Sequence, residues 1–282
     1  MSSMVQSKAK ARSGREEALC KVPVFRPVAI RLMSILTKEE PDILEVAELL
    51  QSDPGFSAEM LTVANSAAFG AVRPVNTMFK AILILGTECT RKLVVRTALQ
   101  GMVRGMREDA TIQNCWIHSR ASGALAAWLA PHYRVHPDRA YTLGLMHDIG
   151  RLGLLAVQGR RYGELLERVS GSNAAVIDAE RILFSTDHCE AGEYLARTWG
   201  LPAEFPEAAR THHQGVSGTM GDSNDLVACA CALAQSLGFS AAPQAECRPI
   251  EELLECVPGG PQAPTQFSAR DLSQFVCKEL QI

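Results

Sequence analysis

The sequence predicts an all-α protein, and three observations support this fold class. Apolar residues recur at helical spacing in one segment after another along the 282-residue chain. No stretch alternates apolar and polar residues convincingly, as a half-buried strand does. Proline, glycine and capping residues stand at the ends of the periodic segments, where helices begin and end.

The N-terminal third is expected to hold four helical segments. "EEPDILEVAELLQSD" (39–53) has an apolar stripe, with Pro41 suited to its first turn. "PGFSAEMLTVANSAAFG" (54–70) repeats this pattern. "TMFKAILILG" (77–86) is apolar nearly all round and ends in glycine, which predicts a helix buried in the middle of a bundle. Another helix is expected over residues 87–103.

The middle of the chain is expected to continue as helices. One covers residues 111–130 and is closed by Pro131. The next begins at Pro137 and carries His147 and Asp148 near its C-terminal end. Two amphipathic helices are then expected over residues 160–170 and 174–185.

The last third is expected to hold four shorter helices. Asp187, with glutamate three residues later, has the spacing of a capping box for residues 188–199. Pro206 opens a short segment that ends at the adjacent His212 and His213. The final helices are expected at residues 223–238, in the core, and near 268–280.

Composition excludes several classes of partner. A net charge of −3 and an isoelectric point of about 6.2 provide no overall field for nucleic acid or an anionic membrane. No apolar run approaches the ~20 residues that a membrane-spanning helix needs. The N-terminal residues lack the apolar stretch of a secretory signal. We therefore expect a cytoplasmic protein that binds neither nucleic acid nor membrane.

The nine cysteines do not form a pattern typical of a disulfide framework or a zinc module. They are scattered, and no C-x-x-C occurs, so reduced thiols are expected. Cys229 and Cys231 lie about 200° apart around a helix and face different neighbours. The pair Arg160–Arg161 and the basic residues at 91–96 are expected to be solvated helix faces.

Five of the seven histidines form the candidate site, together with one aspartate. A single histidine on an apolar helix face is usually bonded to a backbone carbonyl. Five on four predicted segments point instead to a shared interior site. Imidazoles and a carboxylate projected from several helices are the ligands that zinc, iron or manganese requires. The residues are His118, His147, Asp148, His188, His212 and His213.

These residues stand in motifs that resemble the HDOD subfamily of the HD superfamily. The motifs are "CWIHS", "LMHDIGRLGLL", "TDHCEAGEYLARTWGLP" and "THH", preceded by "LLQSDPGFSAEMLTVANSAAFG" and "AILILGTE". The resemblance covers about residues 22–240 and implies a multi-helix HD bundle with an N-terminal helical HDOD portion. The expected organisation is a flexible leader at 1–20, an HDOD domain at 21–240, and a linker with a short C-terminal helix at 241–282.

The resemblance also implies a metal site, from which this chain departs. In catalytic HD phosphohydrolases the residues matching His118, His147 and Asp148 ligate a metal with an aspartate on a late helix. Cys231 stands at that aspartate's position, and Asp225 lies about 240° away around the helix. Losing this carboxylate weakens metal binding and the activation of water. Arg151 replaces a frequent lysine.

Two functions therefore remain open. The first is a non-catalytic module of bacterial signal transduction, with no cofactor and no catalytic residue, that binds signalling proteins or a nucleotide second messenger.

The second is a metal-dependent phosphohydrolase or phosphodiesterase that uses iron, manganese or zinc. It would employ His147 and Asp148 in catalysis, with a Cys231 thiolate as a further ligand. His188, His212, His213 and Arg151 are expected to line the same pocket. A nucleophilic pair of Cys189 and His188 is disfavoured, because adjacent helical residues point about 100° apart. The missing carboxylate favours the first function.

Overall fold

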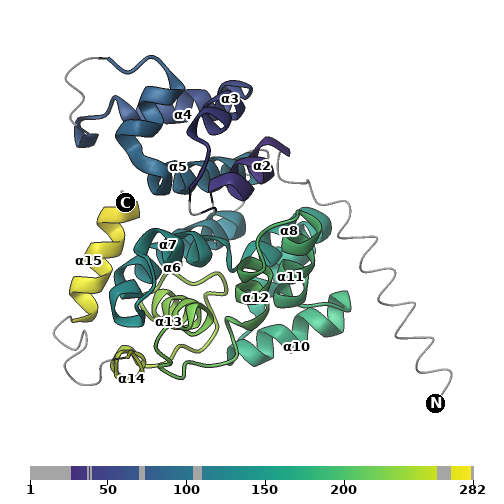
Figure 1. Cartoon of the computed structure of the whole chain (residues 1–282). Coiled ribbons are helices and arrows are strands. Elements are labelled where there is room, and N and C mark those ends of the chain that lie inside the picture. The colour runs from purple at the N-terminus through teal and green to yellow at the C-terminus, as the bar shows by residue number, and fades with distance from the viewer. Residues whose placement is uncertain are drawn as a thin grey trace. The chain divides into compact units, whose positions relative to one another are not determined.

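The computed structural model describes residues 27–258, except 37, 39, 70–73 and 104–109, together with residues 268–280. Within these ranges the chain forms helices and no β-strand (Figure 1). One isolated bridge joins Gly171 and Ala245. The predicted all-α class is therefore confirmed. The leader expected at residues 1–20 lies outside the described residues.

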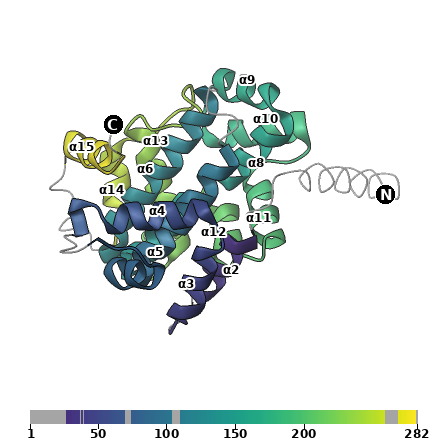
Figure 2. The ribbon, with the colours of Figure 1, turned by 90° about the horizontal axis from the view of Figure 1, so that it is seen from above.

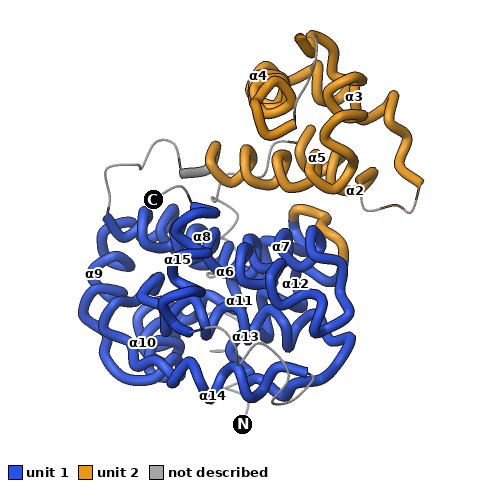
Figure 3. Tube along the Cα trace, turned by 90° about the vertical axis from the view of Figure 1, so that its left-hand side faces the viewer, with its two compact units in different colours: residues 1–23, 106–198, 203–282 blue, residues 24–105, 199–202 orange. Residues whose placement is uncertain are grey.

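The described chain divides into two compact units (Figure 3). The smaller unit contains residues 24–105 and 199–202, and the larger contains residues 106–198 and 203–282. Every residue of the candidate site belongs to the larger unit. The end of the HDOD domain expected at residue 240 was placed from sequence motifs. The division into two units rests on contacts and does not test it, so this boundary stays a prediction.

The smaller unit packs three helices onto one long helix. Aspartates begin two of the three, since Asp42 and Asp53 accept hydrogen bonds from backbone N–H groups of the first turns. Pro41 was predicted to occupy the first turn of this helix. In the structure it precedes the capping residue, Asp42. The helices are α2 (Pro27–Leu36), α3 (Ile43–Gln51), α4 (Pro54–Ala64) and α5 (Met78–Val103).

Helix α4 is shorter than the predicted segment over residues 54–70. The Asn65 side chain donates to the carbonyl of Leu61 and also pairs with both backbone groups of Val75. These bonds turn the chain out of the helix after Ala64. Sequence patterning also missed α2 entirely, although five of its residues are buried.

Helix α5 is broken at Gly86, whose φ of 75° is left-handed. The predicted stop is therefore a kink between two helical halves. The prediction that residues 77–86 lie in the middle of a bundle is wrong, because Phe79 and Leu83 are 40% and 62% exposed. The smaller unit has helices enough to cover only one face of α5. Arg91, in contrast, was expected to be solvated but is buried and pairs with Glu88.

The larger unit is built around α13, which packs against α6, α7 and α12 (Figure 1). Helices α6 and α13 also lie side by side in Figure 2. Helix α11 packs on α8 and α12. The helices are α6 (Ala110–Tyr133), α7 (Pro137–Met146), α8 (Ile149–Gln158), α9 (Arg160–Arg168), α10 (Asn173–Phe184), α11 (His188–Thr198), α12 (Glu204–Thr211), α13 (Ser223–Ser236), α14 (Ile250–Glu255) and α15 (Ala269–Leu280).

Most of these helices match the predicted segments, with three differences. Pro131 lies inside the last turn of α6 rather than closing it, and the helix ends where Arg134 takes a left-handed φ of 55°. Helix α12 begins two residues before Pro206. Helices α8 and α14 were not predicted. The capping role of Asp187 is confirmed, since its carboxylate accepts from the Glu190 N–H at 2.8 Å.

Small residues let α6 and α7 approach closely. A Cβ atom on Gly144 would lie 2.7 Å from the carbonyl oxygen of Ser122 and 2.9 Å from the Cβ of Ala126. A side chain at Gly123 would likewise lie 3.1 Å from the Tyr141 carbonyl oxygen. This close approach brings His118 of α6 and His147, which directly follows α7, to the same interior site.

None of the described helices is both long and apolar enough to cross a membrane. No disulfide joins the cysteines that the structure describes, and their redox state stays a prediction.

We predict that Asp225→Ala lowers the free energy of unfolding by about 1–3 kcal/mol. The Asp225 carboxylate accepts hydrogen bonds from three successive backbone N–H groups at residues 217–219. The variant leaves these donors without their acceptor. Denaturant titration measures the change, with Asp178→Ala on exposed surface as the control. Equal stability of the two variants would show that water replaces the carboxylate at no cost.

Candidate functional site

The His147–Asp148 pair forms the junction between α7 and α8. His147 follows the last residue of α7, and Asp148 precedes Ile149, the first residue of α8. The His147 Nδ1 atom bonds to the carbonyl of Gly144 at 2.6 Å, which leaves Nε2 as the inward-facing ring nitrogen. The sequence prediction placed this pair near a helix end, and the structure agrees.

Histidines from three other helical segments meet this pair. The ring centroid of His147 lies 5.3 Å from that of His118 and 4.7 Å from that of His212. The His188 ring lies 5.4 Å from that of His212 and 5.0 Å from that of His213. The structure therefore brings together all five histidines selected from the sequence.

The buried rings are held mostly by backbone carbonyls. The Nδ1 atom of His118 lies 2.7 Å from the Phe239 carbonyl oxygen, and that of His212 lies 2.9 Å from the Ala209 oxygen. Burial lowers the pKa of His118 to about 4, although Asp148 opposes the shift. Burial also lowers the pKa of His147 and His212. These three rings are therefore neutral at pH 7.

Asp148 is the anion at the centre of the cluster. Its Oδ2 atom accepts from Arg151 Nε at 2.8 Å. Its Oδ1 atom has no hydrogen-bond partner and lies 3.8 Å from His188 Nε2 and 3.7 Å from His212 Nε2. Burial opposes ionisation, but the Arg151 guanidinium and the His188 ring hold the pKa of Asp148 well below its usual range. The carboxylate is ionised.

Arg151 connects Asp148 to a second buried carboxylate. Its guanidinium lies 3.3 Å from each of Glu180 Oε1, the Tyr162 hydroxyl and His188 Nε2. Tyr162 donates to Glu180 Oε1 at 2.7 Å. The side chains of these five residues form the polar network of the site.

Glu180 also orients His188. Its Oε2 atom accepts from the backbone N–H of His188 at 2.9 Å and lies 2.7 Å from Nδ1. Burial and Arg151 lower the pKa of His188, whereas Cys189 and Glu180 raise it, and the balance lies at about 10. Nδ1 carries a proton that Glu180 accepts in either charge state of the ring. The pairing of His188 with Glu180 therefore does not depend on protonation.

Sequence analysis missed Glu180 and Tyr162. Glu180 follows the buried Val176 by four residues, so it lies on the apolar face of α10. A carboxylate on a face that packs against the core is a signal for a buried partner. That partner, Arg151, lies on α8, and nothing in the local sequence connects the two.

Cys231 lies in the site, as its alignment with the family aspartate implied. Its Sγ atom is 3.6 Å from His118 Nε2. Burial raises the pKa of the thiol well above its usual range, so it stays protonated. Asp225, on the same helix, accepts bonds from residues 217–219 and does not reach the site.

The prediction that Cys189 and His188 point apart is wrong. Cys189 Sγ lies 3.5 Å from His188 Nε2. His188 is the first residue of α11, and its bond to Glu180 turns the ring toward its neighbour. The helical angle between adjacent residues therefore does not decide the distance between their side-chain ends.

The donor atoms of the cluster fit a divalent ion in number and kind. Among the described residues, four buried polar atoms of the cluster lack a hydrogen-bond partner: His147 Nε2, Asp148 Oδ1, His212 Nε2 and His213 Nε2. One atom from each of His147, Asp148 and His212 falls in a group whose members all lie within 4.8 Å of one another. Such atoms require an ion or ordered water. The set supplies one negative charge, on the carboxylate that Arg151 also binds.

A helical bundle in which a His-Asp pair at a helix junction meets histidines from three other segments defines a protein of the HD type. A family model, the HDOD domain, matches residues 22–215. The chain therefore belongs to the HDOD family, as the motifs implied.

Solved structures share this fold. An HDOD domain protein of unknown function from Geobacter sulfurreducens superposes with a TM-score of 0.68 at 21% identity, over 95% of this chain and 94% of the other. A proposed phosphohydrolase from Shewanella amazonensis gives 0.63 at 21% identity, over 93% and 92%. A proposed signal transduction protein from Marinobacter aquaeolei gives 0.64 at 16% identity, over 97% and 63%. A search of curated proteins gave no match.

Proposed function

We propose that this protein is a non-catalytic module of bacterial signal transduction that acts by binding another protein. Its membership of the HDOD family supports a signalling role. So does the likeness of its fold to a proposed signal transduction protein. In this proposal the buried histidine cluster has a structural role and stabilises one conformation of the module.

The observation that carries this proposal is the burial of the central residues of the site. His147, Asp148 and Arg151 are 1%, 2% and 1% exposed. A phosphohydrolase must bring a phosphate ester to the reacting water, and the low exposure of these three side chains favours a structural role instead. The buried thiol of Cys231 adds no negative charge to hold a metal. A structural role for the cluster requires no access for a substrate, and ordered water satisfies its unpartnered atoms without a metal.

A second candidate function is a metal-dependent phosphohydrolase. The four unpartnered atoms of the cluster, Asp148 Oδ1 among them, favour it, because unpaired buried polar atoms are costly unless a ligand satisfies them. His147, Asp148 and His212 would hold the ion, which would acidify a bound water. The neutral rings of His118 and His213 could then accept a proton, and Arg151 would keep Asp148 ionised.

The test combines metal content with hydrolysis. We expect purified wild-type protein to contain well under one equivalent of iron, manganese or zinc by elemental analysis. We also expect no hydrolysis of bis(p-nitrophenyl) phosphate or of cyclic dinucleotides with added Mn²⁺ or Mg²⁺. Stoichiometric metal, with turnover that His147→Ala abolishes, would establish the enzyme instead.

Cys231→Asp tests whether the missing carboxylate is the cause. The substitution puts an anionic oxygen beside His118, and we expect the affinity for Mn²⁺ or Zn²⁺ to rise by about tenfold or more. Cys231→Ser changes the polarity without adding charge and should leave the affinity near that of the wild type. Isothermal titration calorimetry measures both. Equal metal affinities for the two variants would show that another feature, such as the Arg151 contact, limits binding.

A further inference from the structure

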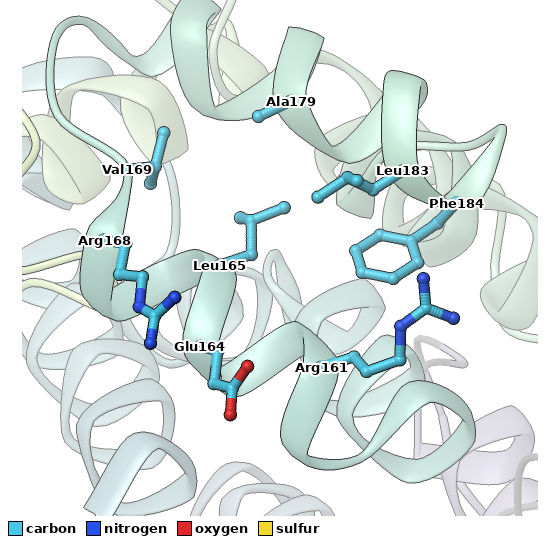
Figure 4. Close-up of a pocket in the computed structure, with 8 residues that line it drawn as sticks. All are labelled: Arg161, Glu164, Leu165, Arg168, Val169, Ala179, Leu183 and Phe184. Atoms are coloured by element: carbon cyan, nitrogen blue, oxygen red, sulfur yellow. The ribbon is translucent and has the colours of Figure 1, made fainter.

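A groove lies between α9 and α10 of the larger unit (Figure 4). Its volume is about 420 Å³, and none of its lining residues belongs to the histidine cluster or to the polar network of the site. The apolar lining consists of Leu165, Val169, Ala179, Leu183 and Phe184. Leu183 is 53% exposed, so this apolar surface is open to solvent.

Two arginines stand at opposite ends of the groove (Figure 4). Arg161 lies against the ring of Phe184, at 5.8 Å from its centroid. Arg168 is seven residues further along α9, which is about 10.5 Å along the helix axis. Within the described residues neither arginine forms an ion pair, whereas the third charged lining residue, Glu164, is bonded to Arg160 at 2.8 Å. The groove thus presents two uncompensated cations on either side of an apolar floor.

We infer that this groove is the docking site for an amphipathic helix of a partner protein, with two carboxylates seven residues apart beside an apolar stripe. A helix lying along α9 has the same rise per residue, so its residues i and i+7 reach Arg161 and Arg168 together. Its apolar residues at i+3 and i+4 then fill the floor around Leu183, as in other helix-in-groove complexes. The inference rests on the proposed function, because it names the surface through which the module binds its partner.

The probe is a fluorescein-labelled peptide of about 15 residues, or four helical turns. It has glutamate at i and i+7 and leucine at i+3 and i+4. Fluorescence anisotropy with the full-length protein measures the dissociation constant. We expect Arg168→Glu and Leu183→Ser each to weaken binding by about tenfold or more. A peptide with lysine opposite position 168 should restore binding to Arg168→Glu. The control is Arg197→Glu, an equal charge change on the exposed face of α11, which should stay within about twofold of wild type.

Four results would overturn the inference. The first is that the peptide fails to bind, and the second is that Arg168→Glu and Arg197→Glu weaken it equally. The third is a dimer that Leu183→Ser converts to a monomer in light scattering, which would assign the groove to a second copy of the chain. The fourth is that a fluorescent nucleotide binds to the protein and that Arg168→Glu abolishes this binding. None of these results affects the hydrolysis assay, so failure of the groove is distinguishable from failure of the proposed function.

Discussion

Gly150→Ala is expected to destabilise the protein by at least about 3 kcal/mol, or to prevent folding altogether. A Cβ atom at this position would lie 1.8 Å from the carbonyl oxygen of His188 and 2.6 Å from the backbone nitrogen of Gly192. Both atoms belong to the backbone of α11, which has no rotamer to change. Helices α8 and α11 would therefore have to separate, and His188 would move away from Asp148.

The matched control is Gly101→Ala, in α5. A Cβ at Gly101 meets nothing within 4 Å, and its backbone is helical. The control should raise stability by about 0.5–1 kcal/mol, because glycine loses more backbone entropy in a helix than alanine does. Circular dichroism during denaturant titration measures both variants. Wild-type stability for Gly150→Ala would mean that α8 and α11 lie further apart than these distances allow.

Arg151→Met is expected to lower the free energy of unfolding by about 3–5 kcal/mol. The guanidinium is a cation that faces both buried carboxylates, Asp148 at 2.8 Å and Glu180 at 3.3 Å, beside the His188 ring. Methionine keeps the apolar stem and removes the charge and all the donors. Both acids then stay buried with no guanidinium to compensate them, which costs more than the wild-type pairs contribute.

Two comparisons check the cause of this loss. Arg160→Met removes an exposed arginine that pairs with Glu164, and it should cost less than about 0.5 kcal/mol. Arg151→Lys keeps the charge but cannot bond several partners at once, so its loss should lie between the two. Urea titrations monitored by fluorescence give the three values. If Arg151→Met were no worse than Arg160→Met, the buried acids would have to be stable without their guanidinium.

Much of the fold could be predicted because helices leave a local signal. The 3.6-residue period, the capping aspartates and the glycines lie within a few residues of the elements that they define. The break in α5 at Gly86, although not that it is a kink, and the start of α11 after Asp187 were predictable in this way. The exposure of Leu83 was not, because it depends on how many helices are available to cover α5.

The candidate site likewise has a part that local sequence predicts and a part that depends on helix packing. The all-α class could be read from the residues alone, and so could the grouping of the five histidines, Asp148 and Cys231 in one site, since each stands in a short motif. The position of Arg151 between Asp148 and Glu180, and the approach of Cys189 to His188, depend on how the helices pack. Those contacts join residues whose partners are chosen by helix packing, and burial then makes each unpaired charge too costly to leave alone. The spacing of residues along the chain does not show which distant groups will pair to avoid that cost.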